Sequence, residues 1–190
     1  MEDTTITRSP DQVTRDTDPS AIMVGGYTAR NVSITGVPEG FRVGGDSVGC
    51  GPVVIEDSYV HVVPPDVCND WHGDGLQGYD GPALTVRNTV LRMTLGPRCG
   101  ATSPFFYPSG QGNTSADIDG LIVDGGGYPF RLGTRGTVRN LHIINNSWVY
   151  GPISVACGLL SSWQASVSTF DANGQPVVAR AQACNTTDGS

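Results

Sequence analysis

The segment 69–78 holds the densest group of side chains that could do chemistry. His72, Asp74 and Gln77 place an imidazole, a carboxylate and an amide close together, and the glycines between them let the backbone turn sharply. An imidazole titrates near neutral pH, and a neighbouring carboxylate such as Asp70 or Asp74 tunes it for proton transfer. If a strand begins here, Leu76 points inward and Gln77 outward, and the polar groups crowd one sheet edge. The segment therefore predicts a site at such an edge.

A polysaccharide lyase is one enzyme whose chemistry these residue types could serve. A uronate lyase needs a group that neutralises the substrate carboxylate, a base that takes a ring proton and an acid that protonates the leaving oxygen. Arg42 or Arg131 could neutralise the carboxylate, because an arginine fork matches its geometry. His72 could be the base, and Tyr79 or Tyr107 could be the acid.

A glycoside hydrolase is the alternative enzyme. It needs two carboxylates at a defined separation, one as general acid and one as base or nucleophile. Asp74 is a candidate for one of them, with Asp46, Asp80 or Asp117 as the other. The sequence leaves this alternative open, because it does not measure the separation.

The same residues also have structural interpretations. Asp74 between two glycines is equally a turn residue bonded to its own backbone, and His72 is equally a loop cap. Trp71 stacks on a sugar or packs its loop, and Gln77 binds a ligand or joins an amide ladder. A divalent cation such as Ca²⁺ on Asp70, His72 and Asp74 is a third alternative, but their spacing matches no established ligand pattern. We therefore expect no cofactor.

A repeat along the chain determines where these side chains stand. Segments that alternate apolar and polar residues recur at spacings of roughly 19 to 35 residues. Alternation with period two predicts strands, and equivalent strands of successive coils stack in parallel around one apolar core. First strands are expected at 22–24, 41–43, 76–78, 105–107 and 130–132, and second strands at 29–34, 55–60, 86–91, 118–123 and 138–143.

The second strands share a polar or glycine residue at their third position. Asn31, Asp57, Asn88, Gly120 and Asn140 occupy it, and these residue types tolerate the left-handed backbone conformation of a bend. The predicted fold class is therefore an all-β, single-stranded, right-handed parallel β-helix, a solenoid. We expect a loosely ordered leader at 1–20, with a short strand near Thr5–Thr7, the β-helix domain at 21–160 and a C-terminal hairpin cap and tail at 161–190.

Side chains between the inward positions point to solvent and form columns across the coils. An exposed aromatic suits a sugar face, although outward arginines can equally serve only solubility. The expected columns are Met23, Arg42, Gln77, Phe106 and Arg131 in the first strands, and Ser33, Tyr59, Val90, Ile122 and His142, with Thr35, His61, Arg92, Asp124 and Ile144, in the second. The candidate catalytic residues are His72, Asp74, Gln77, Arg42 and Arg131, and the candidate substrate-binding residues are Trp71, Tyr59, His61, Arg92, Phe106, Tyr107 and Asp124.

The cysteines predict two crosslinks. Cys68 and Cys99 each follow equivalent strand residues by six positions, so they fall on adjacent coils about 4.8 Å apart. Cys157 and Cys184 flank a predicted hairpin over 162–183, in which Asn173-Gly174 indicates a type I′ turn. Cys50 is left over, either free or paired outside the chain. Paired cysteines favour an extracellular protein, and the polar start of the chain then implies that a signal peptide has been removed.

Composition excludes several classes of protein. The 190 residues carry 26 glycines, only 15% charged residues and a net charge of −7, which disfavours nucleic acid as a partner. All 11 basic residues are arginine, so no lysine base or Schiff base exists. No apolar run is long enough for a membrane span, so no membrane partner is expected. The oligomeric state stays open.

The pattern resembles the right-handed parallel β-helix proteins of the pectate-lyase-like superfamily, particularly secreted β-helix proteins of actinobacterial type. The resemblance runs over about 21–148 and rests on 54–61, 72–77, 86–88, 123–127 and 138–140. It implies an extracellular, carbohydrate-active protein with a polysaccharide partner, most plausibly a lyase for a uronate polymer. The superfamily also has non-catalytic members, so a glycan-binding or adhesive module of a cell surface or phage fibre is the alternative. The chain has no lysine to complete the metal-binding Asp, Lys and Arg set of typical pectate lyases.

Overall fold

The structure is a parallel β-solenoid of about five turns, seen in a computed structural model. It describes residues 1–8, 20–45, 51–63, 73–96 and 102–185. The strands are β1 (Glu2–Thr7), β2 (Thr28–Val37), β3 (Phe41–Gly44), β4 (Val53–Glu56), β5 (Tyr59–Val62), β6 (Asp74–Tyr79), β7 (Ala83–Met93), β8 (Ser103–Tyr107), β9 (Ser115–Asp124), β10 (Phe130–Leu132), β11 (Gly136–Ile144), β12 (Ile153–Val155), β13 (Leu160–Phe170) and β14 (Pro176–Ala181), with one 3₁₀ turn at Cys157–Leu159.

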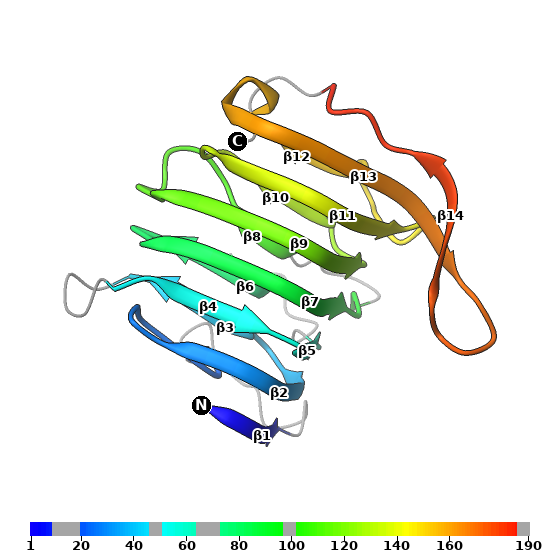
Figure 1. Ribbon diagram of the computed structural model, residues 1–190. Helices are drawn as coiled ribbons and strands as arrows, with labels where there is room; N and C mark the ends of the chain where they lie inside the picture. The colour runs from blue at the N-terminus through cyan, green and yellow to red at the C-terminus, as the bar shows by residue number, and fades with distance from the viewer. Residues whose placement is uncertain (9–19, 46–50, 64–72, 97–101, 186–190) are drawn as a thin grey trace.

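The strands form two sheets that face each other across the core (Figure 1). The larger sheet has nine strands in the order β1-β2-β4-β7-β9-β11-β13-β14, with β5 beside β2 and β7. The smaller sheet has five strands in the order β12-β10-β8-β6-β3. Every pairing of named strands is parallel except β13 with β14. The predicted all-β solenoid is confirmed, and the strand expected near Thr5–Thr7 is longer and joins the larger sheet.

Inward columns of apolar side chains build the core. On the smaller sheet, Phe41, Leu76, Phe105, Phe130 and Ile153 lie in register on successive strands and are at most 3% exposed. The rings of Phe105 and Phe130 stack with centroids 4.7 Å apart. Burying each such side chain stabilises the fold by about 1.5–3 kcal/mol. Because one coil cannot bury its own inward face, this stabilisation depends on stacking.

The predicted bend column is present. Asn31, Asp57, Asn88, Gly120 and Asn140 all have positive φ, between 44° and 75°. The amide of Asn88 donates to the Asp57 carboxylate of the preceding coil at 3.2 Å. Gly120 has no side chain, and a Cβ placed there would come within 2.7 Å of Asn88 Oδ1. The bends therefore stack as a column of side chains that bond one another or leave room for one another.

Charges of alternating sign cross the larger sheet just before the bends. Glu2, Arg30, Glu56, Arg87, Asp119 and Arg139 lie in register on consecutive coils. Arg30 pairs with Glu2 at 2.9 Å and with Glu56 at 2.8 Å, and Arg139 pairs with Asp119 at 3.1 Å. We call this set the charge ladder. Each exposed pair contributes little alone, but like charges in its place would repel.

A hairpin ends the described chain. β13 continues the larger sheet and β14 returns antiparallel along its far half, so that the loop projects beside the sheet (Figure 1). The predicted Cys157–Cys184 disulfide is confirmed and ties the hairpin base to the last coil. The expected type I′ turn is wrong: within the described chain, positive φ in this loop falls on Gly174 and not on Asn173. Asp171 Oδ1 instead accepts the N–H groups of Asn173 and Gln175, both at 2.8 Å, which closes a longer loop.

Cys50, Cys68 and Cys99 lie outside the described residues, so the predicted Cys68–Cys99 bridge stays a prediction. Across the described ranges, no helix has the length and apolar character that crossing a membrane requires.

The bend column predicts that Gly120→Ala destabilises the protein. Alanine in the left-handed region costs about 1–2 kcal/mol, and its Cβ would also press on Asn88. Gly174→Ala is the matched control, because Gly174 has a similar φ of 76° but a Cβ there meets nothing within 4 Å. Urea unfolding should show the larger loss for Gly120→Ala. Equal losses would mean that the neighbouring coil does not constrain the bend.

Candidate functional site

The outward column of the smaller sheet has the predicted register. Four residues lie side by side, in register, on successive strands of this sheet: Arg42 on β3, Gln77 on β6, Phe106 on β8 and Arg131 on β10. Adjacent strands lie about 4.8 Å apart, so the two guanidinium-bearing strands are separated by about 14 Å. We call this surface, together with the exposed Tyr79 at the end of β6, the arginine face.

Aromatic rings support both arginines of this face. The Arg131 guanidinium lies over the Phe106 ring, 4.8 Å from its centroid, and 5.9 Å from that of Tyr128. Phe106 is only 7% exposed, consistent with the guanidinium covering it. Arg42 lies 5.9 Å from the ring centroid of Tyr79, whose side chain is 44% exposed. Such cation–π contacts hold guanidinium groups in place.

Arg42 has no carboxylate partner among the described residues, and its Nε is buried without a hydrogen-bond acceptor there. The hydroxyl of Tyr27 donates to the Arg42 carbonyl at 3.2 Å, which fixes the backbone at this point. An unpaired guanidinium next to an aromatic ring is suited to an anionic ligand, because the ligand supplies the missing acceptor.

Asp74 does not lie on the arginine face. Its side chain points inward with Leu76 and is 0% exposed, whereas Gln77 points outward. Asp74 Oδ1 accepts the N–H of Ser103 on the next coil at 3.0 Å. Desolvation and then the charge of Glu39 raise the pKa of Asp74 well above its usual value. Asp74 is thus an internal carboxyl that links two coils, as the structural interpretation implies, although the bond goes to the next coil and not to its own loop.

The two tyrosines proposed as an acid differ in position. Tyr107 is 0% exposed, its hydroxyl donates to the Pro82 carbonyl at 2.9 Å, and burial raises its pKa. Tyr79 is exposed beside Arg42. Only Tyr79 can therefore meet a ligand on the arginine face. His72 and Trp71, like Asp46 and Asp70, lie outside the described residues, and their roles stay predictions.

The remaining substrate-binding candidates lie on the other sheet. Tyr59 and His61 on β5 pair in register with β7, and Arg92 pairs with Asp124 on β9. Arg92 Nε is 3.1 Å from Asp124 Oδ2, and His61 Nε2 is 2.8 Å from Thr94 Oγ1. Burial, and then the charge of Arg92, lower the pKa of His61. These residues form a second group, which does not share a groove with Arg42 and Arg131.

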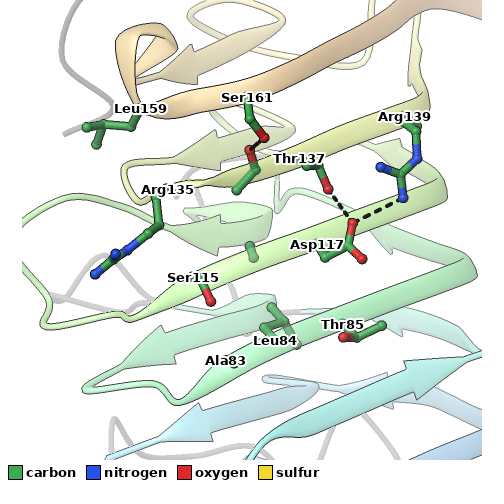
Figure 2. Close-up of a pocket in the computed structure, with 12 residues that line it drawn as sticks. Ala83, Leu84, Thr85, Ser115, Asp117, Arg135, Thr137, Arg139, Leu159 and Ser161 are labelled. Carbon is green, nitrogen blue, oxygen red and sulfur yellow. Dashed lines mark hydrogen bonds and ion pairs between the residues drawn. The ribbon is translucent and has the colours of Figure 1, made fainter.

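The candidate hydrolase carboxylates are also separated. Asp117 lies on the outer face of the larger sheet, in a hollow of about 510 Å³ lined by both polar and apolar side chains (Figure 2). Its carboxylate accepts bonds from Thr137, Arg87 and Arg139. Desolvation opposes ionisation, but the bonds from Thr137 and Arg87 outweigh it and lower the pKa of Asp117. Asp74 and Asp117 therefore do not form a catalytic pair. Asp80 adopts a positive φ of 49° in the turn after β6.

Sequence patterns missed the residues that support this site. Tyr128 beside Arg131 and Glu39 beside Asp74 lie outside the aligned segments. Glu39 sits two residues before Phe41, as Asp74 sits two before Leu76, so extending the alignment backwards would have placed the two carboxyls on adjacent coils.

No family model matches the chain, and no curated protein or solved structure matches it significantly. The residues and their geometry therefore carry the functional argument.

The buried carboxyl predicts a pH dependence of stability. The folded protein holds the Asp74 proton more tightly than the unfolded chain, whose carboxyl titrates near 3.8. The free energy of unfolding should therefore fall as pH rises from about that value through the raised pKa, by at most about 1.4 kcal/mol per pH unit. Asp74→Asn should remove this slope and keep the acceptor for Ser103.

Urea unfolding of both proteins between pH 4 and pH 8 checks this expectation. Asp171→Asn is a useful control, because hydrogen bonds from Gln175 and Asn173 lower the pKa of that exposed carboxyl. The stabilisation that the Asp171 carboxylate provides is lost only as pH falls. The decrease in the free energy of unfolding above pH 5 should therefore persist in Asp171→Asn. An unchanged slope in Asp74→Asn would contradict the assignment.

Proposed function

We propose that this protein is an extracellular carbohydrate-binding β-helix that holds an acidic polysaccharide on its arginine face. The observation that carries the proposal is the column Arg42–Gln77–Phe106–Arg131, in which two guanidinium groups flank an amide and an aromatic ring. Guanidinium groups pair with uronate carboxylates or sulfates, and amides bond hydroxyls. A ligand that reaches both arginines spans several strands, so a polymer fits better than a single sugar.

The resemblance of the repeat to the pectate-lyase-like superfamily supports a carbohydrate ligand, because that superfamily is rich in polysaccharide-active proteins. The Cys157–Cys184 disulfide supports an oxidising, extracellular compartment. The net charge of −7 means that affinity for a polyanion must come from local arginines. Arg42 and Arg131 meet this condition, since both lie on that face and each is held against an aromatic ring there.

A polysaccharide lyase on the same face is the second candidate. The observation that favours it is the exposed Tyr79, a proton donor next to the carboxylate-pairing Arg42, on the strand that follows the His72 segment. Asp74 and Tyr107 take no part in this mechanism, because both are buried away from the face. The base would be His72 and the acid Tyr79.

The binding proposal predicts that Arg42→Ala and Arg131→Ala each weaken binding of polygalacturonate or alginate. Losing one hydrogen-bonded ion pair should cost about tenfold or more in affinity. Titration calorimetry measures the loss, which should shrink at high salt because ions screen the attraction. Arg135→Ala, which removes an exposed arginine in the bend before β11, is the matched control and should bind like the wild type. Equal binding of uncharged dextran, or loss in the control alone, would contradict the proposal.

The lyase candidate predicts the appearance of unsaturated uronate ends, detected by their ultraviolet absorbance, when the protein meets a panel of uronate polymers. His72→Ala and Tyr79→Phe should each abolish the signal and leave polymer binding within about twofold, since neither removes an arginine. No signal with any polymer, combined with tight binding, would leave the non-catalytic function standing and reject the lyase.

A further inference from the structure

The C-terminal hairpin covers part of the outer face of the larger sheet. The pairing of β13 with β14 shifts register between Val167 and Ser168, and the hairpin loop reaches back beside the ends of β9 and β7 (Figure 1). Phe170 and Gly174 of this hairpin line a cavity of about 330 Å³ together with residues of β5, β7 and β9. We call this cavity the hairpin cleft. Its size is at the lower end of the range for small-ligand sites.

The floor of the cleft is apolar in an otherwise polar column. Tyr59, Val90 and Ile122 lie on consecutive coils and point outward. Ser33 precedes this run in the column and His142 follows it, so the apolar run spans only the coils below the hairpin. Phe170 contributes to the cleft but stays 40% exposed. Two aromatic side chains therefore remain accessible at an apolar surface that the hairpin only partly covers.

One end of the cleft is polar and carries no net charge. Arg92 and Asp124 line it and pair with each other at 3.1 Å, with side chains 51% and 13% exposed. His61, in register beside Arg92, has a lowered pKa through burial and is neutral at pH 7. The end therefore offers donors and acceptors without a charge to neutralise.

We propose that the hairpin cleft is a second carbohydrate site, which takes a neutral sugar residue. A pyranose has an apolar face that stacks on aromatic rings and a rim of hydroxyls that a guanidinium–carboxylate pair can bond on both its donor and its acceptor sides. An anionic sugar would compete with Asp124 for Arg92. A wholly apolar ligand would desolvate the ion pair without replacing its hydrogen bonds. A neutral sugar does not compete with Asp124 for Arg92, and its hydroxyls can replace the hydrogen bonds that the ion pair makes with water.

The wall that the hairpin provides is pre-formed. The Cys157–Cys184 disulfide holds its base, and Trp163 Nε1 donates to the Gln182 carbonyl at 2.8 Å. Asp171 closes the loop through its bonds to the N–H groups of Asn173 and Gln175. A pre-formed wall lowers the entropic cost of binding, because the loop need not become ordered with the ligand. The cleft lies on the opposite sheet from the arginine face, so the two sites are independent.

The test uses saturation-transfer NMR of the full chain with the methyl glycosides of glucose, galactose and mannose, and with methyl glucuronide. At least one neutral glycoside should receive saturation from the wild type. Phe170→Ser removes an exposed aromatic wall, and Asp124→Asn replaces the charged acceptor of the polar end by a neutral amide with a single acceptor oxygen. Each change should weaken binding of that neutral sugar by about tenfold. Asp124→Asn should at the same time strengthen methyl glucuronide, because it frees Arg92.

Arg135→Ala, which changes neither the lining of the cleft nor the arginine face, is the control and should bind the neutral glycoside as the wild type does. If a neutral trisaccharide binds more tightly than the corresponding methyl glycoside, the ligand is a glycan chain. If the two bind with equal affinity, the ligand is a free sugar. The proposal is overturned if no neutral glycoside binds, or if Phe170→Ser and Asp124→Asn both leave binding unchanged. Arg42→Ala should lose polyuronate binding and keep binding of the neutral glycoside. The proposals for the arginine face and for the hairpin cleft can therefore fail independently of each other.

Discussion

The common register of the coils is the constraint on which the rest of the structure depends. Inward residues reach the core, and outward residues form columns, only if every coil bends at the same point. The residues with positive φ at Asn31, Asp57, Asn88, Gly120 and Asn140 fix that point. A slip of one residue would exchange the inward and outward faces of a strand. The arginine face and the hairpin cleft are both consequences of this single alignment.

Because period-two alternation and the bend residues are local signals, the sequence was sufficient to predict the coils and the outward columns. The column Arg42, Gln77, Phe106 and Arg131 follows from that alignment alone. Asp74 was harder to interpret, because polarity suggested the surface while its spacing from Leu76 put it inside. Desolvation of its carboxyl raises the pKa of Asp74 and so favours the protonated form.

The hairpin cleft was beyond prediction for a different reason. Tyr59, Arg92 and Asp124 could be placed on one face from the repeat, but the position of Phe170 depends on how β13 and β14 bend back across the sheet. The sequence predicted the disulfide at the base of the hairpin, but the register shift between Val167 and Ser168 has no periodic signal. Contacts between a repeat and a non-repeating segment are set by tertiary packing, which local patterns do not encode.

The charge ladder has a consequence for assembly. A coil of this chain resembles its neighbours closely enough that a strand could pair with a coil two places away, or with a coil of another copy. Such pairing would set Glu2 against Glu56, or Arg30 against Arg87, and like charges would then face each other. The alternation therefore distinguishes odd from even coils. It penalises skipped coils, and stacks of two copies in which like charges meet, even though each ion pair adds little to the stability of the correct pairing.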